Sequence, residues 1–150
     1  MADKIDHSIQ LVFDNYAEAN VLFRVIIEAK AYGLDHHDEE IAASPLVAKI
    51  SRRLVDLLAR HDPYIERSRG NPFRKSWREF IELELGDGRW NEIVLWLQKP
   101  SERQQRNIAD AIENDRLEEY ISDVISPFET SEKNMQILID VVLKSQSNRD

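Results

Sequence analysis

The 150-residue sequence contains no cysteine, which excludes disulfide bonds, thiolate metal sites and a cysteine nucleophile within the chain. Glycine occurs 4 times and proline 5 times, too rarely to build the repeated tight turns of an all-β sandwich or barrel. Long apolar runs are also missing, because Arg24 interrupts the densest stretch, 21–27. That stretch is far shorter than the ~20 residues that cross a bilayer. With no basic segment followed by an apolar one near residue 1, we predict a cytoplasmic protein without a membrane partner.

The residues that are present suit amphipathic helices. The hydrophobic share is 42% and the charged share is 32%, a balance that is typical of helices with charged outer faces. The length corresponds to one domain, and no internal repeat or low-complexity linker divides the chain. We therefore predict an all-α fold, a compact bundle of six or seven helices in a single helical domain over residues 1–150.

Apolar residues recur every three or four positions over residues 6–32, which predicts a long first helix. Residues 21–27 are apolar almost all round, so we expect this part to be buried on several sides. Gly33 is a suitable terminator, because glycine accepts the left-handed conformation of a helix end. The acidic stretch 35–43 has room for a short helix.

Capping signals mark the later helices. A serine or asparagine before proline, or a serine three residues before glutamine, supplies the first hydrogen bond of a helix. Prolines stop helices, and Asn114-Asp115 is a break. The predicted starts are Ser44-Pro45, Asn71-Pro72, Ser101 with Gln104, and Thr130 or Ser131. The predicted stops are His61 before Pro63, the segment before Pro100, and Pro127.

Residues 80–97 allow two interpretations. Residues 81–85 alternate between apolar and acidic, and Gly86-Asp87-Gly88 then turns into another apolar run, a pattern that also fits a β-hairpin and hence an α+β fold. Two helices joined at Gly86 are favoured, because the aromatic stripe of Phe73 and Trp77 begins before the alternation.

The charge is unevenly placed along the chain, whose net charge is −8. Residues 1–48 carry three basic and nine acidic side chains, residues 49–78 carry nine and three, and residues 79–150 carry eight and sixteen. A basic middle segment thus lies between two acidic ends. An acidic chain disfavours broad nucleic-acid binding, but the middle segment suits an anionic surface.

The basic segment supplies the candidate partner-binding residues. Arginine forks bind phosphate or carboxylate groups, and an exposed aromatic ring stacks on a base. Alternatively, Phe73 and Trp77 belong to the core, and the arginines face solvent or pair with the chain's own acidic helices, such as the Glu118-Glu119 region. The candidates are Arg67, Arg69, Arg74, Lys75, Trp77 and Arg78.

A second set of residues has metal-ligand chemistry. The acidic run 35–40 contains His36 and His37, and its simplest interpretation is a solvated segment between helices. The doublet His61-Asp62 resembles that of metal-dependent phosphohydrolases of the HD type, which are helical and add a distant His and Asp. That resemblance implies a metal site of His36, His37, His61 and Asp62, with Asp110 or Asp123 downstream.

No catalytic residue and no cofactor are predicted, because the chain lacks a nucleophile elbow and a glycine-rich phosphate loop. We expect a non-catalytic interaction or regulatory module that binds another macromolecule through charged surface. Either the basic segment 49–78 docks an anionic partner, or the acidic C-terminal faces neutralise a basic partner, as an inhibitor or immunity-type protein does. The expected partner is another protein, with nucleic acid and a second copy bound through the first helix as alternatives. The competing class is the small helical phosphohydrolase.

Overall fold

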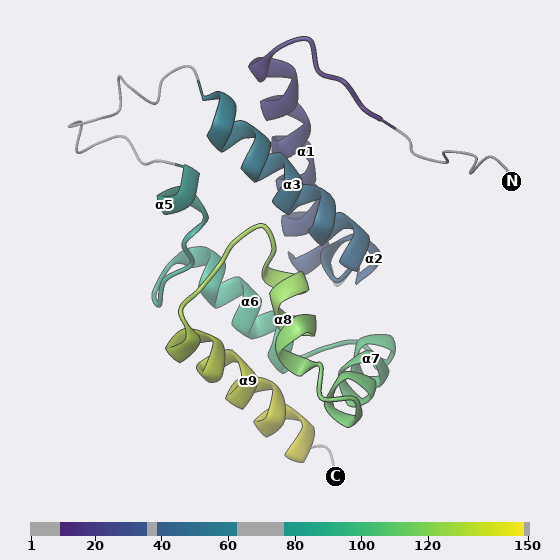
Figure 1. The fold of residues 1–150 in the computed structure, drawn as a ribbon. Coiled ribbons are helices and arrows are strands. Elements are labelled where there is room, and N and C mark those ends of the chain that lie inside the picture. Colours follow the sequence, from purple (N-terminus) through teal and green to yellow (C-terminus); the bar gives the residue numbers. More distant parts are fainter. Residues whose placement is uncertain (1–9, 36–38, 63–76, 149–150) are drawn as a thin grey trace, which may run out of the picture.

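A computed structural model describes residues 10–35, 39–62 and 77–148, and within these ranges the protein is all-α (Figure 1). Among the described residues, six longer helices and two short ones form a compact bundle, the all-α architecture that the sequence predicts. No described helix combines the length and apolar character that a membrane span requires. The longer helices are α1 (Tyr16–Asp35), α3 (Pro45–His61), α6 (Gly88–Gln98), α7 (Glu102–Glu113), α8 (Leu117–Ile125) and α9 (Glu132–Ser147). The short ones are α2 (Glu39–Ala42) and α5 (Trp77–Ile81).

The predicted start of the first helix is wrong. Residues 10–15 are not helical, and α1 begins at Tyr16 because local side chains form a cap there. The Asn15 side chain accepts a hydrogen bond from the Glu18 backbone N–H, and the Glu18 carboxylate accepts one from the Asp14 N–H, both at 3.0 Å. These bonds satisfy donors that a helix N-terminus leaves unpaired. The helix also passes Gly33 and ends at Asp35.

The predicted burial of residues 21–27 on several sides is also wrong. Val21 and Val25 are 62% and 57% exposed, whereas Phe23 is buried. The described neighbours, α2, α3 and α6, therefore cover one side of α1 and leave the side that carries the two valines open.

The capping predictions are confirmed where the structure describes them. Ser44, Ser101 and Ser131 each accept a hydrogen bond from the backbone N–H three residues later, at 3.1 to 3.2 Å. Helix α3 ends at His61, before Pro63. Asp115 has a φ of 57°, a left-handed conformation that separates α7 from α8. The start predicted at Asn71-Pro72 lies outside the described residues.

Two helices, not a hairpin, span the ambiguous region. Helix α5 ends at Ile81 and α6 begins at Gly88, with Asp87 as its N-cap and Gly86 at a φ of 86° in the turn between them. The extended residues between the helices pair instead with a distant segment, through an isolated parallel bridge between Glu82 and Glu129.

The buried apolar residues form two clusters. One joins α1, α3 and α5 around Phe23, Leu54 and Leu58, and the other joins α6 to α9 around Trp96, Ile121 and Leu138. Phe128, in the connection between α8 and α9, packs against both. In Figure 1 the α1–α3 pair forms the upper part and α6 to α9 form the lower part.

Candidate functional site

The one candidate partner-binding side chain that the structure describes, Trp77, is partly buried and packs against the core cluster of α1, α3 and α5. Its indole N–H donates to the Tyr16 hydroxyl at 3.0 Å, and its ring makes edge contacts with Phe23 at 5.3 Å and Phe80 at 5.7 Å. These contacts fasten α5 to α1. The ring therefore serves packing, the alternative to base stacking that the sequence left open.

The remaining basic candidates are not placed. Arg67, Arg69, Arg74 and Lys75 lie outside the described residues. Arg78 belongs to α5, but its side chain is not described. Their role in binding an anionic partner stays a prediction.

The metal-site candidates are placed only in part. His61 is exposed at the last residue of α3, with Asp62 as its C-cap, whereas His36 and His37 lie outside the described residues. A metal site shared by these four residues therefore stays a prediction.

The two downstream carboxylates of that resemblance are in ion pairs. Asp123 pairs with Arg52 at 3.1 Å, and Asp110 pairs with Arg116 at 3.3 Å. Across the described ranges, no three His, Asp or Glu side chains come together in a way that would hold a metal ion.

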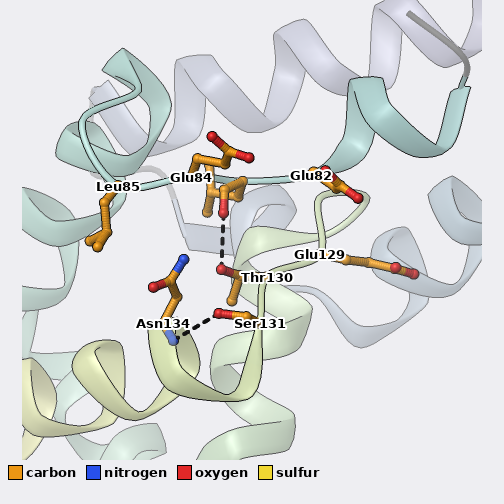
Figure 2. Close-up of a pocket in the computed structure, with 8 residues that line it drawn as sticks. Glu82, Glu84, Leu85, Glu129, Thr130, Ser131 and Asn134 are labelled. Carbon is orange, nitrogen blue, oxygen red and sulfur yellow. Dashed lines mark hydrogen bonds between the residues drawn. The ribbon is translucent and has the colours of Figure 1, made fainter.

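A groove lies where the extended segment after α5 runs beside the start of α9 (Figure 2). Its volume is about 620 Å³. The Leu83 N–H donates to the Glu129 carbonyl at 2.7 Å, and the Thr130 hydroxyl donates to the Leu83 carbonyl at 2.9 Å, so the two walls are held together by hydrogen bonds. Three exposed carboxylates line this first groove: Glu82, Glu84 and Glu129.

A second groove adjoins the first and shares Glu129 and Thr130 with it. It runs along α8 toward the end of α7, and its volume is also about 620 Å³. The apolar part of its lining consists of Ile125, Phe128 and Met135. Four further exposed carboxylates line it: Asp115, Glu118, Glu119 and Glu132.

Helix electrostatics explain part of this acidic lining. Glu118 and Glu119 occupy the first turn of α8, and Glu132 occupies the first turn of α9. Carboxylates are favoured at helix N-termini, where the helix dipole is positive. The two N-termini thus bring acidic side chains to one surface.

The cations that line the second groove are already paired. Arg52 donates to Asp123 and to the Ser122 hydroxyl, and Arg116 pairs with Asp110 outside the groove. The seven groove carboxylates form no ion pair with another described residue. We call this surface, formed by both grooves, the acidic double groove.

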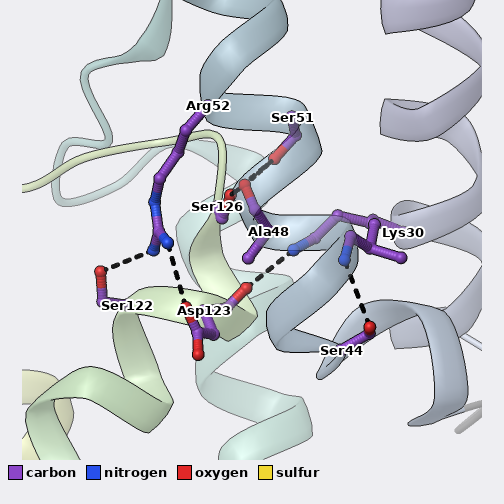
Figure 3. Close-up of polar contacts among 9 residues, drawn as sticks. Lys30, Ser44, Ala48, Ser51, Arg52, Ser122, Asp123 and Ser126 are labelled. Atoms are coloured by element: carbon purple, nitrogen blue, oxygen red, sulfur yellow. Dashed lines mark hydrogen bonds and ion pairs between the residues drawn. The ribbon is translucent and has the colours of Figure 1, made fainter. Parts of the chain in front are cut away.

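A set of polar contacts joins the two core clusters (Figure 3). Lys30 on α1 is 4% exposed, and its amine donates to the Asp123 carbonyl at 2.8 Å. Burial lowers the pKa of Lys30 from 10.5 to about 7. The buried hydroxyls of Ser51 and Ser126 lie 2.7 Å apart, and both contact the Ala48 carbonyl.

Sequence reasoning missed both features. The signal for Lys30 was its position, since it continues the buried stripe of Ala19, Phe23 and Ile26 at helical spacing. The acidic double groove had a weaker signal, because its carboxylates come from three separate segments that only the fold brings together. Glu118-Glu119 alone was named in advance.

No family model, curated protein or solved structure matches this chain.

Proposed function

We propose that this protein is a non-catalytic binding module whose acidic double groove binds a basic segment of a partner protein. The observation that supports this proposal is the set of seven exposed carboxylates around an apolar lining, none of them in an ion pair with another described residue. Such a surface suits a partner that brings several cations together. Of the two functions expected from the sequence, it corresponds to the one in which acidic C-terminal faces neutralise a basic partner.

The chemistry of the lining defines the fit. Lysine and arginine side chains place their hydrocarbon stems on apolar surface and keep their cations at polar groups. In the second groove, stems would lie on the partly exposed Phe128, while the cations would meet Glu118, Glu119 or Glu132. Arginine would form the stronger contacts, since its planar fork binds carboxylates in pairs of hydrogen bonds. Binding would weaken with salt, because the carboxylates are exposed.

In the alternative function, the basic segment 49–78 binds an anionic partner. Comparing variants of the two surfaces distinguishes this function from binding by the acidic double groove. The full-length protein is immobilised, and proteins captured from its source cells are identified by mass spectrometry. The Glu118→Lys/Glu119→Lys variant is expected to lose the captured partner, whereas Arg69→Glu/Arg74→Glu is expected to retain it. The opposite pattern would assign binding to the basic segment and refute the acidic double groove.

A matched control distinguishes the effect of charge at the groove from the effect of the protein's net charge. The Glu28→Lys/Glu102→Lys variant makes the same change in net charge at exposed positions on α1 and at the start of α7, which line neither groove. It is expected to capture the partner as the original protein does. Circular dichroism checks that every variant remains folded. If all charge reversals weaken capture equally, the partner responds to net charge, and the proposed site is wrong.

A further inference from the structure

The two core clusters meet at a polar contact that is buried at Lys30, Ser51 and Ser126 and partly exposed at Arg52. From the α1–α3 side it contains Lys30, Ala48, Ser51 and Arg52, and from α8 it contains Ser122, Asp123 and Ser126 (Figure 3). Ser51 and Ser126 are at most 1% exposed. Apolar contacts tolerate many arrangements, but each bond in a buried polar contact depends on the partner staying in place.

Lys30 is joined to α8 at a backbone carbonyl that the helix itself cannot satisfy. The carbonyl of Asp123 would normally accept the N–H four residues later, but that residue is Pro127, which has no N–H. The Lys30 amine supplies the missing donor at 2.8 Å. The Asp123 carboxylate is directed to Arg52 at 3.1 Å, so one residue of α8 is held from both α1 and α3.

We propose that Lys30 is a proton-sensitive tether between the two clusters: its neutral amine closes the contact of α1 with α8, and protonation loosens that contact. A neutral amine needs one acceptor and tolerates an apolar site. An ammonium carries three donors and loses its hydration when it is buried, yet here it has one hydrogen bond among the described residues. Opening the contact would return the charge to water.

The surroundings of the amine support this assignment. Burial is the largest cause that lowers the pKa of Lys30, Arg52 on α3 lowers it further, and the Asp123 carboxylate on α8 raises it. The described side chains of α2, Ile41 and Ala42, are apolar. The charged residues of α6, which also contacts α1, are Arg89 and Glu92, and both are exposed. Among the described side chains, Asp123 is therefore the carboxylate that opposes the loss of the proton.

The test follows Lys30 and the contact together. In protein labelled with ¹³C-lysine, NMR is expected to show one lysine that titrates near pH 7 and is missing from Lys30→Met. Amide exchange, normalised for its intrinsic pH dependence, should rise at residues 122–126 by up to about tenfold per pH unit as the pH falls from 10.5 to about 7, because one proton is taken up on opening, and it should level off below that midpoint. Exchange in α9 should not follow this titration.

Two variants sharpen the result. Lys30→Met keeps the side chain length without an ionisable group and is expected to abolish the pH response, whereas Lys49→Met removes an exposed lysine of α3 and should leave it intact. The proposal is overturned if Lys30 titrates above pH 9.5. It is equally overturned if Lys30 titrates near pH 7 while exchange at residues 122–126 stays constant. The Lys30 titration and the amide exchange at residues 122–126 are both measured on the original protein, so these outcomes are informative even if Lys30→Met does not fold.

Discussion

The hydroxyl oxygens of Ser51 on α3 and Ser126 after α8 lie 2.7 Å apart in the buried contact between the two core clusters. Both hydroxyls are also within hydrogen-bonding distance of the Ala48 carbonyl. Each hydroxyl has one proton, so at most two of these three contacts are hydrogen bonds at one time, and the choice made by one serine limits the other. The two serines are 75 positions apart in the sequence, and their pairing fixes where the C-terminal end of α8 meets α3.

We expect the two serines to be energetically coupled. Ser51→Ala and Ser126→Ala should each lower the free energy of unfolding by about 1 kcal/mol, because each leaves the other hydroxyl with fewer partners. The double variant should cost less than the sum, since no buried hydroxyl then remains that has lost a partner. Denaturant unfolding measures all four proteins, with the exposed Ser147→Ala as a control. Strict additivity would show that the two hydroxyls act independently.

Trp77 should behave as a core residue. Trp77→Ala removes a large ring that packs against Phe23 and Phe80, and we expect it to lower the free energy of unfolding by about 3 kcal/mol. Tyr16→Phe removes the hydroxyl that accepts the indole N–H, and a loss of about 1 kcal/mol is expected. Thermal and denaturant unfolding measure both effects. A Trp77→Ala protein of unchanged stability would contradict the packing described above.

Stability should rise with pH between 7 and 9 because of Lys30. Its pKa is about 7 in the folded protein and 10.5 without burial, so between these values the unfolded chain binds more protons than the folded one. The contribution is fully present above pH 10.5 and is lost as the pH falls through 7. Unfolding at pH 9 should therefore cost about 2 kcal/mol more than at pH 7, an increase in Tm of roughly 4 to 8 °C.

Lys30→Met tests that assignment by calorimetry. The variant should show a flat stability profile over the same pH range and should be more stable than the original protein at pH 6, where the buried ammonium costs most. Lys49→Met should keep the original profile, because its side chain is exposed. A Lys30→Met protein with an undiminished slope would trace the pH dependence to another group.

The sequence predicted local features well because they depend on near neighbours. Ser44, Ser101 and Ser131 cap helices through side chains that act within three residues, and Asp115 breaks one through its own backbone conformation. The error at Val21 and Val25 has a different origin. An apolar pattern shows which residues favour burial, but the neighbours that cover one face of α1 come from distant parts of the chain.

The candidate site was harder to predict for the same reason. Glu82, Glu118 and Glu129 come from three segments, and hydrogen bonds between Leu83 and the residues 129 and 130 bring two of these segments together. Nothing within either segment indicates that pairing. The uneven charge along the chain indicated residues 49–78 as a binding segment, because these basic residues are close together in the sequence. The carboxylates of the acidic double groove come together only when the chain folds.

Binding by the acidic double groove should depend strongly on salt and on charge at the groove. Raising the ionic strength from 0.05 M to 0.5 M should weaken partner binding at least tenfold, mainly through slower association, because exposed carboxylates are screened. Surface plasmon resonance with the purified partner measures both rate constants. Binding that is unaffected by salt would show that apolar contact, and not charge, provides the affinity.

The most direct test of the proposed site is an NMR map of the full-length ¹⁵N-labelled protein with the captured partner added stepwise. The acidic double groove predicts that amide signals shift first at residues 82–85, 115–119 and 129–135, while the exposed face of α1 at Val21 and Val25 stays unchanged. Shifts centred on that face of α1, or on the residues between α3 and α5, would contradict the account.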